Sequence, residues 1–301
     1  MDGLKKQNKS NTIFFVCLVA LPLVQFFVFY ICVNSNSIIL AFKNYDSLTG
    51  NYSFAGFKNF QQFFIQYSEM NLIKTAIKNS LIVYACTLLI GTTLGLLFSY
   101  FVYKKAFCSP IFKNLLFLPS IVSSIVMVLL FTQFVERALP VAIDNVLQIQ
   151  VIGLLSNAKT VLGTIIFYNI WVSFGPVALM YVGAMNGVPE SVLEAGKIDG
   201  TTDLKEFIYI ILPMIFPTIV VFLTVGIAAI FTNQINLYAF FGPNAEPSLY
   251  TIGYYLYRNT QVGTIADYPY YSAVGILMTF VAIILTFTFR FILKKWGPSQ
   301  E

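Results

Sequence analysis

Histidine is absent from this 301-residue sequence, and charged residues are scarce. Without an imidazole, the chain has no His-based catalytic triad and no His metal site. Only 10% of the residues are charged, whereas 57% are hydrophobic and 17% are aromatic. Because soluble domains carry about 25% charged residues, this composition predicts a protein that lies in lipid.

Six long windows have almost no charge, and each is long enough to cross a bilayer core, which takes roughly 20 residues of helix. They lie at about 12–33, 79–103, 114–135, 160–185, 207–231 and 270–289. We therefore expect an all-α polytopic membrane protein with six transmembrane helices in a single domain over residues 1–301. No Asp or Glu lies well inside a window to act as a buried acid or base. A membrane enzyme or an ion-coupled secondary transporter, which often uses intramembrane ionisable groups, remains the alternative.

The four cysteines are also few, and they lie within or beside the predicted spans at unrelated spacings: Cys17, Cys32, Cys86 and Cys108. Such positions suit small apolar core residues better than a disulfide framework or a metal site.

The distribution of Lys and Arg predicts the orientation. With a cytoplasmic N-terminus, the inside segments hold Lys5, Lys6, Lys9, Lys104, Lys105, Lys113, Lys197, Lys205, Arg290, Lys294 and Lys295. The outside loops are longer in total and hold Lys43, Lys58, Lys74, Lys78, Arg137, Lys159 and Arg258. The greater density inside favours a multi-pass membrane protein with both termini cytoplasmic. The first window is too long for a signal peptide and is expected to be an uncleaved span.

A polar segment, PESVLEAGKIDGTTDLKEFIYIILP, interrupts the apolar sequence at 189–213, between the fourth and fifth spans on the cytoplasmic side. Pro189 suits the first turn of a short helix. Gly200 can adopt the left-handed conformation that ends such a helix. Asp203 and Glu206 have the spacing of a capping pair that opens a second helix. On composition alone, this loop could also be a plain solvated connection.

The spacing within this loop resembles a known signature. The pattern consists of Glu194-Ala195-Gly196, three residues, Gly200, nine residues, Ile210, one residue and Leu212-Pro213. It is similar to the Glu-Ala-Ala loop of binding-protein-dependent ABC importer permeases. The departure is Gly196 in place of the second Ala, which is expected to loosen the short helix by up to roughly 1 kcal/mol. Weaker similarities at Phe54–Phe60, Leu118-Pro119 and Phe241-Gly242-Pro243 point to the carbohydrate branch of this family.

This resemblance implies a type I ABC importer permease fold and the membrane-spanning part of a sugar or oligosaccharide importer. The loop at 189–206 would be the coupling element that docks on the ATPase. Its residues are Leu193, Glu194, Ala195, Gly196, Ile198, Asp199 and Gly200. Gly196-Lys197 lacks the glycine and the Ser or Thr of a phosphate-binding loop, so we expect the chain to bind no cofactor, with ATP and Mg on the partner ATPase.

The resemblance also implies the partners. They are a second permease subunit, with a heterodimer preferred over a homodimer, two ABC ATPase subunits, a solute-binding lipoprotein outside the cell, a sugar and the lipids of a bacterial plasma membrane. No run of interleaved Arg and aromatic residues indicates nucleic-acid binding.

Polar residues at membrane depth are candidates for the solute path, because unpaired polar groups are costly in lipid. The candidates are Tyr168, Asn169, Trp171 and Ser173 in the fourth span, and Asn233 and Asn236 after the fifth. Amides and aromatic rings suit a neutral sugar. Asn169 and Ser173 are four residues apart and share a helix face, so they are the preferred pair. Hydrogen bonding between helices, with no solute involved, is the alternative.

Overall fold

The structure is a computed structural model that describes the backbone of residues 2–297 and, for the N-terminal helix, side chains from Phe14 onward. The described chain is mainly helical and contains six helices that are long and apolar enough to cross a membrane. They are Phe14–Ala41, Asn71–Tyr103, Ser124–Leu147, Val161–Met185, Asp203–Ala228 and Tyr268–Lys295. The prediction of six spans is confirmed. The side chains of Lys5, Lys6 and Lys9 and the two chain ends, used above for the orientation, lie outside the described residues.

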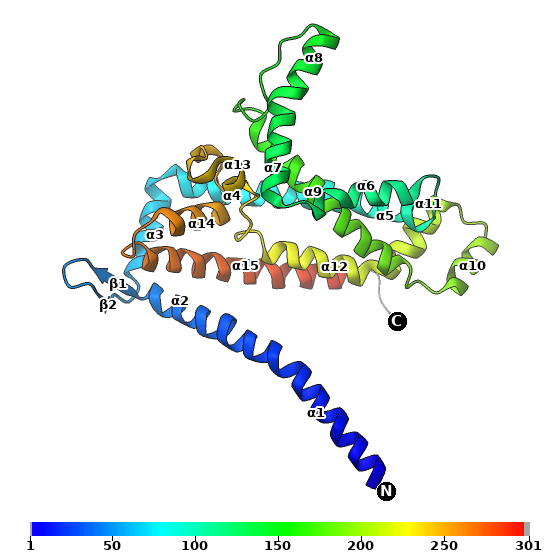
Figure 1. The fold of residues 1–301 in the computed structure, drawn as a ribbon, viewed down its shortest axis with the longest axis horizontal. Coiled ribbons are helices and arrows are strands. Elements are labelled where there is room, and N and C mark those ends of the chain that lie inside the picture. Colours follow the sequence, from blue (N-terminus) through cyan, green and yellow to red (C-terminus); the bar gives the residue numbers. More distant parts are fainter. Residues whose placement is uncertain (1, 298–301) are drawn as a thin grey trace. The chain divides into compact units, whose positions relative to one another are not determined.

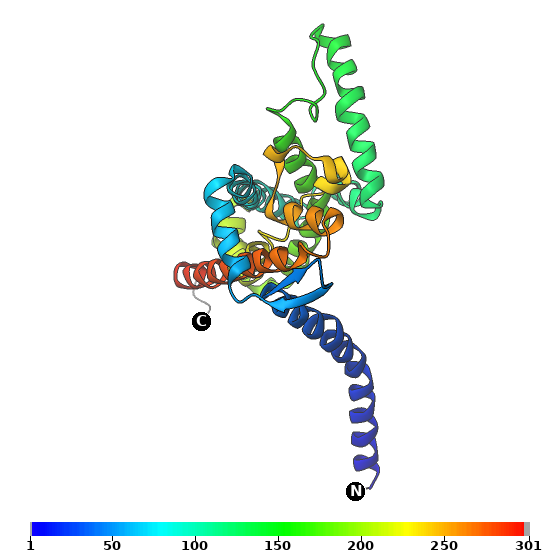
Figure 2. The ribbon, with the colours of Figure 1, turned by 90° about the vertical axis from the view of Figure 1, so that its left-hand side faces the viewer.

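The chain divides into two compact units, Met1–Ser68 with Gly263–Leu277, and Glu69–Val262 with Met278–Glu301. Figures 1 and 2 show the ribbon in two views.

The first unit holds the first span and a small hairpin. The span comprises α1 (Asp2–Gln25), a π-helical segment (Phe26–Cys32) and α2 (Val33–Ala41). An antiparallel pair follows, β1 (Lys43–Asp46) and β2 (Asn51–Phe54), and then α3 (Lys58–Glu69). The α15 helix (Tyr268–Trp296) begins in this unit and continues into the second.

Two side chains fix the hairpin of the first unit. The Asn59 Nδ2 donates to the backbone oxygens of Ala41 and Lys43, both at 2.8 Å. Asp46 closes the turn by accepting from the Leu48 backbone N–H and the Thr49 hydroxyl, both at 2.9 Å. These hydrogen bonds, led by the one from Leu48, lower the pKa of Asp46. This hairpin is a small addition to the expected all-helical fold.

The second unit contains the second to fifth spans. The second span is α4 (Asn71–Cys86), a π-helical segment η2 (Thr87–Thr92) and α5 (Thr93–Tyr103). The α9 helix (Val161–Met185) is the fourth span, and 44% of its apolar window is buried, more than in any other described span. Gly175 allows this central position, because a Cβ there would collide with the backbone of Leu116 and Phe117 on α6.

The third predicted span, 114–135, is not one continuous helix. The α6 helix ends at Ile121, and α7 begins at Ser124. Between them Val122 (ψ 144°) and Ser123 (ψ 134°) are extended, and Pro119 has no backbone N–H to continue the helical bonding of the last turn. The apolar helix instead runs through α7 (Ser124–Gln133), a π-helical segment and α8 (Leu139–Leu147). Both views show α8 projecting away from α5 and α9 of the same unit (Figures 1 and 2).

The rest of the second unit follows α9. The α10 helix (Glu190–Ile198) precedes the fifth span, which consists of α11 (Asp203–Lys205), a π-helical segment η4 (Glu206–Ile211) and α12 (Leu212–Ala228). Short helices then form the segment before the sixth span: α13 (Leu237–Phe241), two 3₁₀ turns (Gly242–Asn244 and Pro247–Leu249) and α14 (Ile252–Val262).

Candidate functional site

The loop between the fourth and fifth spans folds as a helix, a turn and a second helix. The α10 helix begins directly after Pro189, whose extended ψ of 133° makes it the N-cap residue. Gly200 has φ +72°, which confirms the expected left-handed turn. The Gly200 N–H donates to the Lys197 oxygen at 3.1 Å and the Thr201 N–H to the Gly196 oxygen at 3.0 Å. These bonds satisfy carbonyls at the helix end and give the loop a defined shape.

Gly196 has a packing role within the loop. It is buried, and the Thr201 hydroxyl donates to its backbone oxygen at 2.7 Å. A Cβ at this position would lie 2.5 Å from Ile210 Cδ1 and 3.2 Å from Thr201 Oγ1. The glycine therefore lets α10 approach η4 closely, which gives the departure from the family signature a local reason.

The coupling-loop residues divide between an exposed surface and the interior of the chain. Glu194, Ala195, Asp199 and Gly200 are exposed, and Ile198 is 86% exposed although it is apolar. Leu193, one of the loop residues expected to dock on the ATPase, instead packs against a core cluster of its own chain. That cluster contains Tyr181, Met185, Val188, Phe207, Ile211, Ile215 and Ile219. Leu193 thus fixes α10 to the ends of the adjoining spans.

Asp203 and Glu206 do not form the predicted capping pair. The N-cap residue is Thr202, and its side chain makes no cap hydrogen bond. Both carboxylates turn to Lys104 at the end of α5, whose Nζ lies 2.9 Å from Asp203 Oδ1 and 3.2 Å from Glu206 Oε1. A cation attracts a carboxylate more strongly than a neutral backbone amide does, which explains the difference. No local pattern indicates this contact, because Lys104 and Glu206 are 102 positions apart.

This ion cluster is partly buried. Glu206 is 3% exposed, and the Tyr100 hydroxyl donates to its Oε1 at 3.4 Å and to the Asp203 backbone oxygen at 2.8 Å. Burial acts to lower the pKa of Lys104, but the hydrogen bonds to Asp203 and Glu206 outweigh burial and raise that pKa above its ordinary value. Lys104 is therefore a cation at neutral pH.

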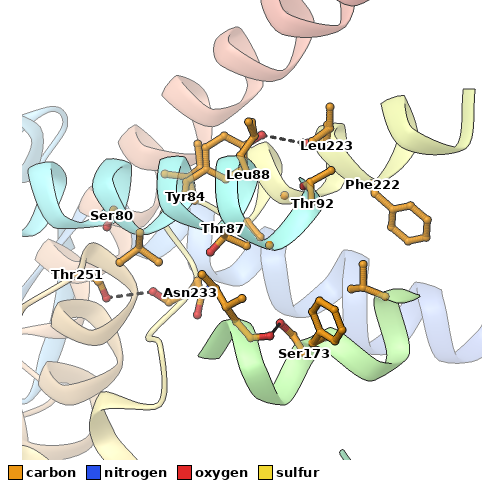
Figure 3. A pocket seen from close by; sticks show the side chains of 18 of the residues that line it. Ser80, Tyr84, Thr87, Leu88, Thr92, Ser173, Phe222, Leu223, Asn233 and Thr251 are labelled. Carbon is orange, nitrogen blue, oxygen red and sulfur yellow. Dashed lines mark hydrogen bonds between the residues drawn. The ribbon is translucent and has the colours of Figure 1, made fainter. Parts of the chain in front are cut away.

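A pocket of about 210 Å³ lies among the second, fourth and fifth spans (Figure 3). The π-helical segment η2 contributes Thr87, Gly91 and Thr92 to its wall. The other polar lining residues are Ser80, Tyr84, Ser173, Tyr181, Asn233 and Thr251. None of the described residues that line this pocket is charged. The pocket thus offers hydroxyl, amide and aromatic groups in a mainly apolar wall.

Hydrogen bonds orient several of these polar groups. Figure 3 shows the Thr251 hydroxyl donating to the Asn233 backbone oxygen, at 3.0 Å. The Asn233 Oδ1 accepts from the Ile235 N–H at 2.8 Å. The Ser173 hydroxyl donates to the backbone oxygens of Asn169 at 2.8 Å and Ile170 at 3.1 Å. Of the solute-path candidates, Ser173 and Asn233 line the pocket.

The other candidates serve packing in this structure. The Asn169 Nδ2 donates to the backbone oxygens of Ile165 (2.8 Å) and Ile235 (2.9 Å), and its Oδ1 accepts from Asn236 Nδ2 at 2.7 Å. Ile235 and Asn236 have φ of +46° and +57°, so Asn169 braces a loop with an unusual backbone. This arrangement matches the helix-packing alternative for Asn169.

The two aromatic candidates of the fourth span lie in a neighbouring apolar cluster. Tyr168 is 1% exposed, with its ring centroid 4.9 Å from that of Phe131 and 5.0 Å from that of Phe240. Trp171 packs against the same cluster. Sequence reasoning missed Ser80, Thr87 and Thr251 as pocket residues; hydroxyls inside apolar windows were the available signal for the first two.

The sequence profile of the family described as "Binding-protein-dependent transport system inner membrane component" matches residues 87–296. The chain belongs to this family. It is therefore a multi-pass membrane component of a transport system, and the family favours transport over the membrane-enzyme and ion-coupled alternatives.

Several curated relatives are permease proteins. The chain is 26% identical to "Probable ABC transporter permease protein YurN" of Bacillus subtilis over 59% of this chain and 62% of that protein, so the match spans less than two thirds of YurN. It is 27% identical to "Arabinooligosaccharides transport system permease protein AraP" of the same organism, over 70% of this chain and 69% of AraP. It is 22% identical to "Multiple sugar-binding transport system permease protein MsmF" of Streptococcus mutans, over 68% and 71%.

A solved structure shares the fold. A chain in the crystal structure of a bacterial alginate ABC transporter, in complex with an alginate pentasaccharide-bound periplasmic protein, superposes with a TM-score of 0.77. The sequence identity is 22%, and the match covers 96% of each chain. The expected type I permease fold is confirmed.

Proposed function

We propose that this chain is the membrane-spanning permease subunit of an ATP-driven importer that takes a neutral oligosaccharide from an external binding protein. The observation that carries the proposal is the exposed α10 helix, set by the left-handed Gly200 turn and packed on its own spans through Leu193. A short rigid helix in this place can transmit a push to the fourth and fifth spans. The sugar-permease names of AraP and MsmF support the oligosaccharide.

The proposed energy source is a pair of separate ABC ATPase subunits, which bind ATP and Mg, and the exposed surface of the loop is their docking site. Ile198 offers an apolar contact and Glu194 and Asp199 offer carboxylates. The remaining partners are a second permease, giving a heterodimer, and a solute-binding lipoprotein. In this arrangement α10 and both termini face the cytoplasm, as the Lys and Arg bias predicts.

The pocket is the proposed part of the solute path, in place of the face carrying Asn169. Sugar hydroxyls need paired donors and acceptors, which Ser80, Thr87, Ser173 and Asn233 supply. The C–H faces of a sugar ring stack on aromatic rings such as Tyr84. Because the described residues that line the pocket carry no charge, a charged solute would be desolvated there without compensation from those residues.

The docking part is tested with an Ile198→Asp variant of the complex. A buried charge at the interface is expected to reduce co-purification of the ATPase subunits by about tenfold or more, since an unpaired buried charge costs several kcal/mol. Phe107→Asp is the matched control, because Phe107 is an equally exposed apolar residue (91%) outside the coupling loop. Equal recovery of the ATPase with wild type and Ile198→Asp would refute the docking site.

The solute path is tested with Thr87→Val, which keeps the shape of the side chain and removes one hydroxyl. Uptake of labelled neutral oligosaccharides is expected to fall about fivefold or more, as a lost hydrogen bond to solute costs about 1 kcal/mol or above. Thr224→Val, a similar change in α12 outside the pocket, is the control. Uptake by Thr87→Val equal to that by Thr224→Val and wild type would place the path elsewhere.

A further inference from the structure

The cluster of Lys104, Asp203 and Glu206 joins two spans at the point where the coupling loop ends. Lys104 is the C-cap residue of α5, and the two carboxylates lie in the first turns of the fifth span. A cation is favourable at a helix C-terminus and carboxylates are favourable at a helix N-terminus. The cluster therefore suits both helix ends in addition to the ion pairs themselves.

The three side chains differ in exposure, which sets their contributions. The side chain of Asp203 is 77% exposed, that of Lys104 29% and that of Glu206 4%. An exposed ion pair adds little stability, whereas a buried carboxylate that loses its partner is strongly destabilising. The contact between Lys104 and Glu206 is thus the important one, and Asp203 adds a second bond to the same ammonium.

Neutral contacts extend the same junction. The Tyr100 hydroxyl donates to the Asp203 backbone oxygen at 2.8 Å, and the Tyr100 ring centroid lies 4.7 Å from that of Phe207. Tyr100 and Leu193 both pack against the core cluster that contains Phe207. The second span, α10 and the start of the fifth span consequently meet at this junction.

We propose that Lys104 is a positioning residue that ties the second span to the coupling loop, so that a displacement of α10 moves the second, fourth and fifth spans together. This inference rests on the proposed function, in which the ATPase subunits displace α10. Without the Lys104 ammonium, Glu206 and Asp203 repel each other beside a buried surface, and the start of the fifth span separates from α5. The ATPase would then still dock on α10, but the second span would not move with α10. The second span lines the pocket through Thr87 and Thr92.

The first test measures the tie without any transport assay. Hydrogen exchange of the backbone amides in residues 199–206 is followed in the reconstituted complex, where the Thr201 and Glu206 amides are hydrogen-bonded. Lys104→Met is expected to speed exchange there by about tenfold or more, because the junction opens locally. Lys104→Arg should restore slow exchange. Lys105→Met, which removes an adjacent exposed positive charge, should leave exchange at the wild-type rate.

The second test measures solute imported per ATP hydrolysed in the same variants. Lys104→Met should lower this ratio about fivefold or more while the ATPase subunits stay bound, at the lower end of typical coupling between sites. Lys104→Arg should return the ratio to the wild-type value. It should also return the hydrogen exchange of residues 199–206 to the wild-type rate. Wild-type exchange and a wild-type ratio in Lys104→Met would overturn the proposal.

A double variant covers the case in which Lys104→Met fails to assemble. Lys104→Met with Glu206→Gln removes the buried carboxylate together with its partly exposed partner cation, and such neutral replacements are often tolerated. The double variant should assemble and still import little solute per ATP hydrolysed. A wild-type ratio of solute to ATP, or a failure to assemble, would make the cluster a folding element and would overturn the positioning role. If the wild-type complex itself imports no solute, the proposed function fails, while the exchange data still decide whether Lys104 forms the tie.

Discussion

Replacing Asn169 with Leu should damage the fold of the segment after the fifth span, even though Asn169 lies at membrane depth where a solute contact was expected. Its amide makes two hydrogen bonds outside its own helix, to the Ile235 oxygen and from the Asn236 side chain. Leucine can make neither bond. Ile235 is 1% exposed, so its backbone oxygen would have poor access to water as a replacement partner.

The magnitude follows from these two bonds. A net hydrogen bond contributes about 1 kcal/mol, and an unsatisfied buried group costs about 1–3 kcal/mol. Since Asn169 is only partly buried, we expect Asn169→Leu to lower the free energy of unfolding by about 2 kcal/mol. In a double-mutant cycle with Asn236→Ala, the pair should couple by about 0.6 kcal/mol, the average for interhelical hydrogen bonds in a membrane protein. The strain of alanine at the positive φ of Asn236 is present in both arms of the cycle and cancels.

Thermal or denaturant unfolding of the purified complex, followed with a thiol-reactive dye, measures these differences. Ser173→Ala is the control, because the Ser173 hydroxyl donates only to backbone oxygens of its own helix, those of Asn169 and Ile170. A stable Asn169→Leu complex with zero coupling to Asn236 and no import would refute the reasoning and would restore Asn169 as a solute contact.

Three further outcomes are expected. Gly196→Ala gains about 1 kcal/mol of helix propensity, but the new Cβ meets Ile210 Cδ1 at 2.5 Å, so the free energy of unfolding should stay near the wild-type value. Gly196→Ala combined with Ile210→Val should be more stable than wild type, and a lower stability of this double variant would contradict the packing. Gly200→Val should cost about 1–2 kcal/mol at φ +72° and weaken ATPase co-purification, with insertion into the membrane unchanged, and wild-type co-purification would argue against a rigid turn. Cys108, in the short segment after the second span, should react with an impermeant thiol reagent only in inside-out vesicles, and labelling in intact cells would reverse the orientation.

The main features that the sequence predicts are those encoded locally. The six spans follow from apolar runs of sufficient length, and the Gly200 turn follows from one residue with an uncommon backbone preference. The break at Val122 and Ser123 lies inside a window that is apolar on average, so hydropathy alone does not reveal it. Pro119 and the pair Ser123-Ser124 were the local signals.

Contacts between distant residues account for the errors in the candidate site. The sequence spacing of Asp203 and Glu206 correctly suggested a helix start, but Lys104, 102 positions from Glu206, determines where the carboxylates point. Asn169 and Ser173 do share a helix side, but the Asn169 side chain is hydrogen-bonded to the backbone oxygen of Ile235, 66 positions away. Periodicity predicts which residues share a face, and it does not predict what that face will meet.

The central claim is that ATP hydrolysis by partner subunits drives import through this chain from a binding protein. The most direct measurement is uptake of labelled neutral oligosaccharides into proteoliposomes that contain the chain, its partner permease and the ATPase subunits, with ATP on the ATPase side. The account predicts uptake only when ATP and the binding protein are both present, no change on collapse of ion gradients, and loss of uptake in Ile198→Asp. Uptake that continues without ATP, or that follows an ion gradient, would contradict it.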